Sequence, residues 1–294
     1  MKLRTALKLG RVSNLPTVWT NTLAGAVLAS APGVPTSFGA EFAVMLLAFS
    51  LFYTGGMFLN DAFDARIDAV ERPERPIPSG EISLKEVFSW GIGMMLAGVV
   101  LLGWVGLMMP PRTGLWPAFG GLALALTVTY YNWNHKGNLF SPVVMGLCRV
   151  LVYLGAGWCY TTQPASALWV GAALILCYLI GLTYVAKQEN LAEVSNLWPL
   201  LFLAAPAVYG AWLIPSNTIV ALFWLALCAW VLVALRYLKR RQKGDIPRAV
   251  VSLIAGISLL DAMLIAANGF PLLAVFAVVG FAITLFFQRH ISGT

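Results

Sequence analysis

Residues 60–80 read NDAFDARIDAVERPERPIPSG and lie between two apolar segments. Charged residues make up 11% of the chain, yet this stretch is dense in them. They are the carboxylates Asp61, Asp64, Asp68, Glu71 and Glu74 and the arginines Arg66, Arg72 and Arg75. A chain that is otherwise apolar therefore concentrates its ionisable chemistry at one place, where an apolar segment ends.

The spacing of the polar residues indicates a metal and diphosphate site. On a helix that continues out of the preceding apolar segment, Asn60, Asp61, Asp64 and Asp68 share a broad face. Carboxylates so close together repel one another unless a cation lies between them, and their hard oxygen atoms suit Mg2+. The arginines and the turn-forming sequence RPIPSG then offer forked donors to phosphate oxygens. The alternative is a solvated loop whose charges keep it out of the lipid.

These 21 residues resemble the first aspartate-rich motif of the UbiA superfamily of intramembrane prenyltransferases. The resemblance implies that Mg2+ on an isoprenyl diphosphate is held by Asn60, Asp61, Asp64 and Asp68, of which the three aspartates are the catalytic residues. It also implies that Arg72 and Arg75 face the diphosphate. The stretch SNLPTVWTN at residues 13–21 resembles the start of the first helix in the same superfamily, which favours a retained first helix over a cleaved signal peptide.

The remaining sequence predicts an all-α, polytopic transmembrane bundle of nine to ten helices. The chain has 294 residues, 60% of them hydrophobic, and a mean hydropathy of +0.81. Its apolar runs are continuous and long enough to span a bilayer, and they do not alternate as strands would. The ten predicted segments are 14–31, 41–59, 87–109, 114–131, 140–160, 166–185, 197–213, 218–238, 249–267 and 270–288. No linker divides them, so we expect one domain over residues 1–294.

The net charge of +7 is explained by membrane topology and not by nucleic acid. With the N-terminus in the cytoplasm, every lysine and arginine except Arg112 and Arg149 lies on the cytoplasmic side or at its edge. This asymmetry follows the positive-inside rule. It predicts an integral protein of the cell membrane with its active site on the cytoplasmic side. The four cysteines lie singly in apolar segments, so neither disulfides nor a zinc site is indicated.

A second acidic segment reads GLTYVAKQENLAEVSN at residues 181–196, after the sixth predicted helix and on the same side as the first motif. Glu189 and Glu193 are four residues apart and complete the predicted set of metal ligands. Tyr184 and Lys187 precede them as predicted substrate-binding residues. The superfamily usually carries D-x-x-x-D here, after a tyrosine. This chain departs from that pattern, since Gln188 takes the place of the first aspartate.

Three further charged residues are candidates for the site. Lys136, after the fourth predicted helix, resembles a basic residue of the superfamily and is predicted to bind the diphosphate; the alternative is a positive anchor at the membrane surface. Arg149 lies inside an apolar segment, where a charge is costly and indicates function. We expect it to meet a phosphate, a site carboxylate or an acceptor. Asp261, in another segment, either pairs with Arg149 or forms local hydrogen bonds.

The resemblance implies Mg2+-dependent transfer of an isoprenyl group from a polyprenyl diphosphate to a small acceptor within the membrane, with release of pyrophosphate. The acceptor is unidentified. With this altered second motif, the chain resembles the branch of the superfamily that is associated with ebo-type gene clusters. That resemblance allows a cyclitol-like acceptor. The alternative function is a non-catalytic protein that binds or transports isoprenoid diphosphates with a degenerate second motif.

Overall fold

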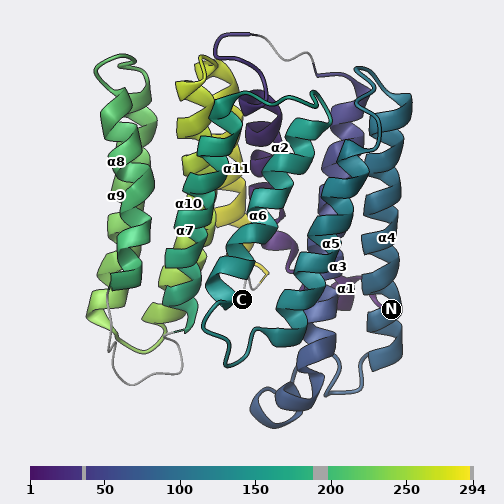
Figure 1. Cartoon of the computed structure of the whole chain (residues 1–294). Helices are drawn as coiled ribbons and strands as arrows, with labels where there is room; N and C mark the ends of the chain where they lie inside the picture. The colour runs from purple at the N-terminus through teal and green to yellow at the C-terminus, as the bar shows by residue number, and fades with distance from the viewer. Residues whose placement is uncertain (35–37, 188–197, 292–294) are drawn as a thin grey trace.

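The computed structural model describes residues 1–34, 38–187 and 198–291. Across these ranges the chain is helical and contains no strand, which confirms the predicted all-α class. Figure 1 shows the long helices standing side by side in one bundle. The elements are α1 (Leu3–Leu9), η1 (Val12–Asn14), α2 (Leu15–Leu28), α3 (Ala40–Glu71), α4 (Leu84–Met108), α5 (Trp116–Asn134), α6 (Ser141–Trp158), α7 (Ser166–Lys187), η3 (Trp198–Leu203), α8 (Ala204–Leu213), α9 (Val220–Arg240), α10 (Asp245–Ala267) and α11 (Pro271–Gln288).

The helix count differs slightly from the predicted nine to ten. Helices α2 to α11 follow the ten predicted segments, and α1 is additional, which gives eleven α-helices in the part of the chain that the structure describes. Helix α1 has seven residues and carries charged side chains, so hydropathy does not reveal it. Seven of the described helices are long and apolar enough to cross a membrane. Helix α10 is continuous through Asp261.

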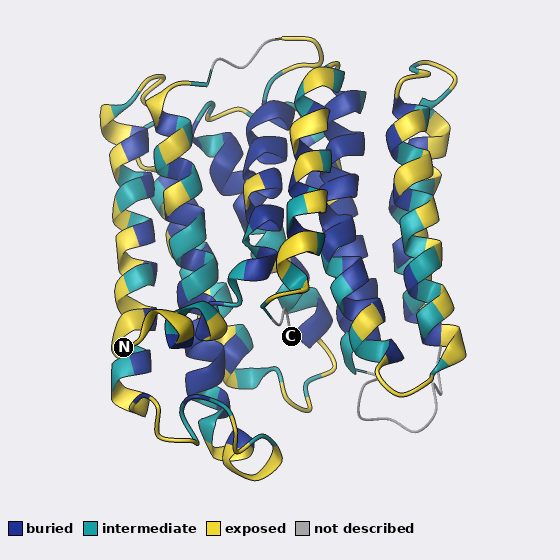
Figure 2. Ribbon diagram, turned by 180° about the vertical axis from the view of Figure 1, so that it is seen from behind, coloured by how far each residue is buried: buried dark blue, intermediate teal, exposed yellow. Residues whose placement is uncertain are grey.

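Helix α10 forms the centre of the bundle. It packs against α2, α7, α9 and α11, and it is buried along nearly its whole length. Figure 2 shows the buried residues concentrated in the central helices, whereas the outer helices alternate between buried and exposed residues. A mostly apolar helix that is buried on all sides fits the interior of a membrane bundle.

Helix α3 carries the acidic motif at its C-terminal end. With 32 residues it is about 48 Å long, which exceeds the roughly 30 Å of a bilayer's hydrocarbon core. Its last turns therefore extend past the neighbouring helices, at the lower end of the bundle in Figure 1. The chain then turns through residues 72–83 into α4, where Ser83 caps the helix by accepting a hydrogen bond from the backbone of Glu86 at 3.2 Å.

Small residues bring the helices around the site into close contact. A Cβ atom at Gly25 in α2 would lie 2.5 Å from the carbonyl oxygen of Tyr153 in α6. A Cβ atom at Gly55 in α3 would likewise lie 2.9 Å from the carbonyl oxygen of Gly91 in α4. Backbones approach this closely only where glycine removes the side chain. These contacts fix how α2 and α3 face the rest of the bundle.

Candidate functional site

Four polar residues of the acidic motif lie on one buried face of α3. Asn60, Asp61, Asp64 and Asp68 are each at most 9% exposed, although they belong to the helix end nearest the bundle surface. The predicted continuation of the apolar helix through the motif is therefore confirmed. Burying three carboxylates on one face requires compensating positive charge or hydrogen bonds.

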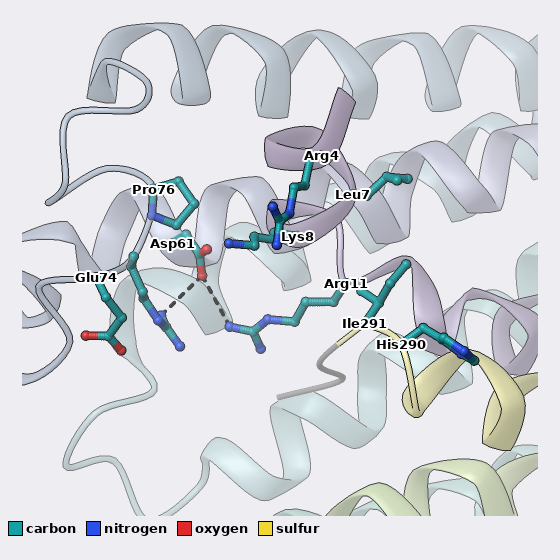
Figure 3. A pocket seen from close by; sticks show the side chains of 10 residues that line it. Arg4, Leu7, Lys8, Arg11, Asp61, Glu74, Pro76, His290 and Ile291 are labelled. Atoms are coloured by element: carbon teal, nitrogen blue, oxygen red, sulfur yellow. Dashed lines mark hydrogen bonds and ion pairs between the residues drawn. The ribbon is translucent and has the colours of Figure 1, made fainter. Parts of the chain in front are cut away.

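Two arginines supply that compensation around Asp61. Arg11 Nη2 lies 3.2 Å from both Asp61 Oδ1 and Asn60 Oδ1, and Arg75 Nη1 lies 3.3 Å from Asp61 Oδ1. The same nitrogen of Arg75 is 2.7 Å from Asp68 Oδ2. Figure 3 shows Asp61 with its two contacts to guanidinium groups. Arg75 thus bridges two carboxylates seven residues apart on α3, and Arg11 reaches Asp61 from the segment after α1.

The third carboxylate, Asp64, faces the segment after α5. Lys136 Nζ lies 3.2 Å from Asp64 Oδ1, and His135 Nε2 lies 3.8 Å from Asp64 Oδ2. The His135 ring is stacked on Tyr131, with ring centroids 5.0 Å apart. The structure therefore brings Lys136 into the acidic cluster, and its binding to a diphosphate stays a prediction.

Asn132 joins this cluster to the bundle interior. Asn60 Nδ2 donates to Asn132 Oδ1 at 3.3 Å, and Asn132 Nδ2 donates to the carbonyl oxygen of Gly56 at 2.9 Å. Asn132 also lines a cavity between α3, α5 and α6 whose walls are largely apolar. Phe49, Phe52 and Val152 contribute to those walls. The polar cluster and the apolar cavity are thus adjacent, which is the arrangement that a ligand with a charged head and an apolar tail requires.

A second pocket, at the outer side of Asp61, is strongly basic. Arg4, Lys8, Arg11 and Arg75 line it together with Glu74 (Figure 3). His290 and Ile291 close it from the C-terminal end of the chain. Four cations against the carboxylates of Asp61 and Glu74 leave an excess of positive charge, so this pocket fits a polyanion.

Arg149, on α6, lies on the wall of the apolar cavity and not in the acidic cluster. Its Nη1 donates to Asn21 Oδ1 at 2.8 Å and its Nη2 to Thr17 Oγ1 at 3.1 Å. Asp261, fully buried on α10, accepts from Asn21 Nδ2 at 2.8 Å and 3.0 Å. Asp261 thus forms hydrogen bonds and, among the described residues, no direct ion pair with Arg149; Asn21 lies between the two and bonds to both.

The predicted residues Arg72 and Lys187 form no ion pair with the acidic cluster among the described residues. Arg72 forms the C-terminal cap of α3 and has no ion pair within residues 1–34, 38–187 and 198–291. Lys187 Nζ donates to the carbonyl oxygen of Asn138 at 2.6 Å. Tyr184 lies in the last turns of α7. Glu189 and Glu193 lie outside the described residues, so their predicted part in the site stays a prediction.

The donor set around α3 suits Mg2+ in its chemistry. Asn60, Asp61, Asp64 and Asp68 supply hard oxygen atoms from one helix face. In the described part of the chain the carboxylates are held by Arg11, Arg75 and Lys136, and no group of three acidic, histidine or cysteine side chains is close enough to hold a metal. A bound metal ion would therefore neutralise the negative charge of the carboxylates in place of these cations.

Sequence reasoning missed two residues of the site. Arg11 contacts Asn60 and Asp61. Asn132 contacts Asn60. Their contacts with α3 span 49 and 72 residues along the chain, so no local spacing reveals them. The single available signal for Arg11 is its place directly before the first apolar helix.

The sequence of the chain is similar to known proteins over most of its length. The UbiA prenyltransferase family matches residues 18–257. The digeranylgeranylglyceryl phosphate synthase of Methanopyrus kandleri is 28% identical over 214 residues, which cover 71% of this chain and 70% of that protein. The protein of the same name from Ignicoccus hospitalis is 34% identical over 143 residues, which cover 47% of this chain and 43% of that protein.

Solved structures share the fold at low sequence identity. A UbiA homolog from Aeropyrum pernix has a TM-score of 0.64 at 12% identity and covers 87% of this chain and 97% of its own. A UbiA homolog from Archaeoglobus fulgidus, bound to GPP and Mg2+, has a TM-score of 0.54 at 14% identity and covers 96% and 99%. Identities this low establish a common fold and leave the chemistry to the site itself.

Proposed function

The chain belongs to the UbiA prenyltransferase family, and from that membership we propose that it transfers an isoprenyl group from an isoprenyl diphosphate to a small acceptor and releases pyrophosphate. The family match confirms the resemblance drawn from residues 60–80 and the interpretation as a membrane prenyltransferase. The observation that carries the proposal is the adjacency of a charged cluster and an apolar cavity, joined by the hydrogen bond from Asn60 to Asn132.

The charged cluster is proposed to bind the diphosphate. Asn60, Asp61, Asp64 and Asp68 would hold Mg2+, and a bound Mg2+ supplies charge neutralisation to the leaving diphosphate. The use of Mg2+ is supported by the solved homolog from Archaeoglobus fulgidus with GPP and Mg2+. Glu189 and Glu193 remain proposed ligands from the segment after α7.

The cations of the cluster are proposed to contact the diphosphate directly. Arg11, Arg75 and Lys136 pair with the carboxylates in the described structure. If the carboxylates bound a metal ion, these three side chains could donate hydrogen bonds to phosphate oxygens within the same cluster. Arginine is suited to this task because its fork matches two phosphate oxygens at once. Arg72 and Lys187, with Tyr184, are proposed to assist from the edge.

The reaction requires that a carbon–oxygen bond break and a new bond form at C1 of the isoprenyl group. The electron pair of the C1–O bond goes to the diphosphate oxygen, and the acceptor atom forms a bond to C1. The proton that the acceptor loses goes to the released pyrophosphate. The largely apolar walls of the cavity between α3, α5 and α6 would disfavour water near C1 and so limit hydrolysis of the donor.

The active site is proposed to face the cytoplasm. The acidic motif, the segment after α5 and the segment between α9 and α10 lie at one end of the bundle (Figure 1). These segments contain Arg66, Arg72, Arg75, Lys136, Arg241 and Lys243, whereas the opposite end carries Arg112. The positive-inside rule assigns the basic end to the cytoplasmic side.

Release of pyrophosphate from geranylgeranyl and farnesyl diphosphate tests the proposal. Purified protein in detergent, supplied with membrane extract as a source of acceptor, is expected to release pyrophosphate only with Mg2+, and Asp64→Ala is expected to abolish release. Asp245→Asn, which changes a buried carboxylate paired with Arg240 away from the site, is the matched control. Donor binding without release would favour the binding or transport function instead, and unchanged release in folded Asp64→Ala would refute the proposed site.

A further inference from the structure

Two ionisable side chains lie inside the bundle, apart from the acidic cluster. Arg149 and Asp261 belong to the apolar helices α6 and α10, and Asp261 is fully buried. Charged groups at membrane depth are costly, so they need partners and indicate a functional site. The proposed diphosphate site does not use either residue.

Asp261 is surrounded by hydrogen-bond donors. Thr20 Oγ1 donates to Asp261 Oδ2 at 2.6 Å, and Asn21 Nδ2 donates to both carboxylate oxygens. The Tyr153 hydroxyl donates to Asp261 Oδ1. An ionised carboxylate is purely an acceptor, so a shell of three donor side chains favours its charged form.

Asn21 couples this carboxylate to the guanidinium of Arg149. The amide oxygen of Asn21 accepts from Arg149 at 2.8 Å, while its amide nitrogen donates to Asp261. The amide dipole is thus oriented by a cation on one side and an anion on the other. With Asp261 ionised, Arg149 and Asp261 would balance each other's charge through Asn21.

Arg149 faces a cavity that it shares with the reaction site. Tyr53, Tyr131 and Asn132 line the same cavity, and the Arg149 guanidinium lies 5.9 Å from the centroid of the Tyr53 ring. The bonds to Asn21 and Thr17 engage two of the five N–H donors of an arginine. The guanidinium of Arg149 therefore lies on the cavity wall with N–H groups free to donate hydrogen bonds. Asn132, which bonds to Asn60, lines the same cavity.

We propose that Arg149 binds the acceptor, and that its coupling to Asp261 through Asn21 makes this subsite select an uncharged, hydroxyl-bearing acceptor over an anionic one. The proposal rests on the proposed function, because an acceptor is required only for prenyl transfer. A hydroxyl oxygen accepts a hydrogen bond from the guanidinium without changing the net charge. An anion would leave one negative charge uncompensated among apolar walls, since Asp261 already balances Arg149.

The selected acceptor supplies the nucleophile. Its hydroxyl oxygen forms the bond to C1 as the bond from C1 to the diphosphate oxygen breaks, and the hydroxyl proton goes to the released pyrophosphate. The relatives named digeranylgeranylglyceryl phosphate synthase make a phosphate-bearing product. Because Asp261 already balances the charge of Arg149, this chain should disfavour an acceptor that carries such a phosphate.

Two matched pairs of probes test the selection. Each pair contains an alcohol and its anionic counterpart: geranylgeranylglycerol with geranylgeranylglyceryl phosphate, and 4-hydroxybenzyl alcohol with 4-hydroxybenzoate. Purified protein in nanodiscs receives both members of a pair together with radiolabelled geranylgeranyl diphosphate and Mg2+. The ratio of the two labelled products is measured within each variant, so the amount of active protein cancels. The wild-type protein is expected to prefer the alcohol by about tenfold or more.

Two substitutions should shift this ratio in opposite directions. Asp261→Asn keeps the shape of the side chain and leaves Arg149 uncompensated, so the ratio should move toward the anion by about tenfold. Arg149→Gln leaves Asp261 uncompensated and should move the ratio further toward the alcohol. Arg149→Lys retains the charge and should stay near the wild-type ratio. Asp245→Asn on the same helix α10, whose carboxylate pairs with Arg240, is the control that should not change it.

The outcomes separate this inference from the proposed function. Absence of pyrophosphate release from wild-type protein would refute the proposed function itself. Three outcomes, each with pyrophosphate release intact, would overturn the acceptor assignment alone. They are a preference for the anions, no alkylation of either alcohol, and shifts of the ratio in the same direction in Asp261→Asn and Arg149→Gln. A purely structural role for the cluster predicts lower yield in both variants without opposite shifts of the ratio.

Discussion

Arg11 and Asp61 are fifty residues apart in sequence, and their side chains form an ion pair of 3.2 Å. The arginine follows α1, and the aspartate lies on the buried face of α3. This contact ties the N-terminal segment to the acidic motif and places a cation where the diphosphate is proposed to bind.

Arg11→Gln should lower the kcat/KM of pyrophosphate release about a hundredfold, because it removes a charge-assisted donor from the diphosphate site. Steady-state release with geranylgeranyl diphosphate and Mg2+ measures the effect. Arg112→Gln is the matched control, since both arginines have a left-handed backbone and Arg112 lies between α4 and α5, away from the acidic motif. Equal activity of the two variants would contradict a role for Arg11 at the diphosphate.

Arg75→Gln should destabilise the metal-free protein by about 2 kcal/mol, because the charges of Asp61 and Asp68 lose their shared partner. Thermal unfolding in detergent with EDTA should show a lower Tm than wild type. Addition of Mg2+ should raise the Tm of the variant more than that of wild type, since the metal replaces the lost positive charge. Arg72→Gln, which removes a neighbouring arginine without that ion pair, should show neither effect. A Tm of Arg75→Gln that does not respond to Mg2+ would contradict metal binding at these carboxylates.

Asn132→Leu should reduce pyrophosphate release about tenfold, because Asn60 loses the partner that fixes its side chain. Asn134→Leu on the same helix is the control, since the hydrogen bond from Asn134 to Tyr130 is exposed. Release is compared at saturating donor and Mg2+, after both variants are shown to be folded by thermal unfolding. Full activity of Asn132→Leu would show that the orientation of Asn60 is not set by this bond.

Gly25→Val should destabilise the bundle by about 3 kcal/mol or more, since the added atoms meet the rigid backbone of Tyr153. Gly93→Ala in α4 is the control. A Cβ atom there meets nothing within 4 Å, and alanine favours the helix, so its stability should match or exceed wild type. Thermal unfolding of both variants in detergent compares them. A Gly25→Val protein as stable as wild type would mean that α2 and α6 are not held at this distance.

The sequence by itself determined the membrane-spanning helices and the acidic face of α3. Apolar length and the spacing of Asn60, Asp61, Asp64 and Asp68 are local properties, because a helix repeats every 3.6 residues and a bilayer sets the length of a span. The same local properties could not reveal α1, which is short and polar. They also indicated a charged residue inside α6 and another inside α10, without assigning their partners.

The tertiary structure alone decided which side chains meet. Arg11 reaches Asp61 across the chain, Asn132 holds Asn60, and Asn21 joins Arg149 to Asp261. These contacts depend on how α2, α3, α5, α6 and α10 and the segment after α1 pack against one another, with close helix approach at small residues. Periodicity fixes the face on which a residue lies, whereas only the packing of distant helices fixes what that face touches.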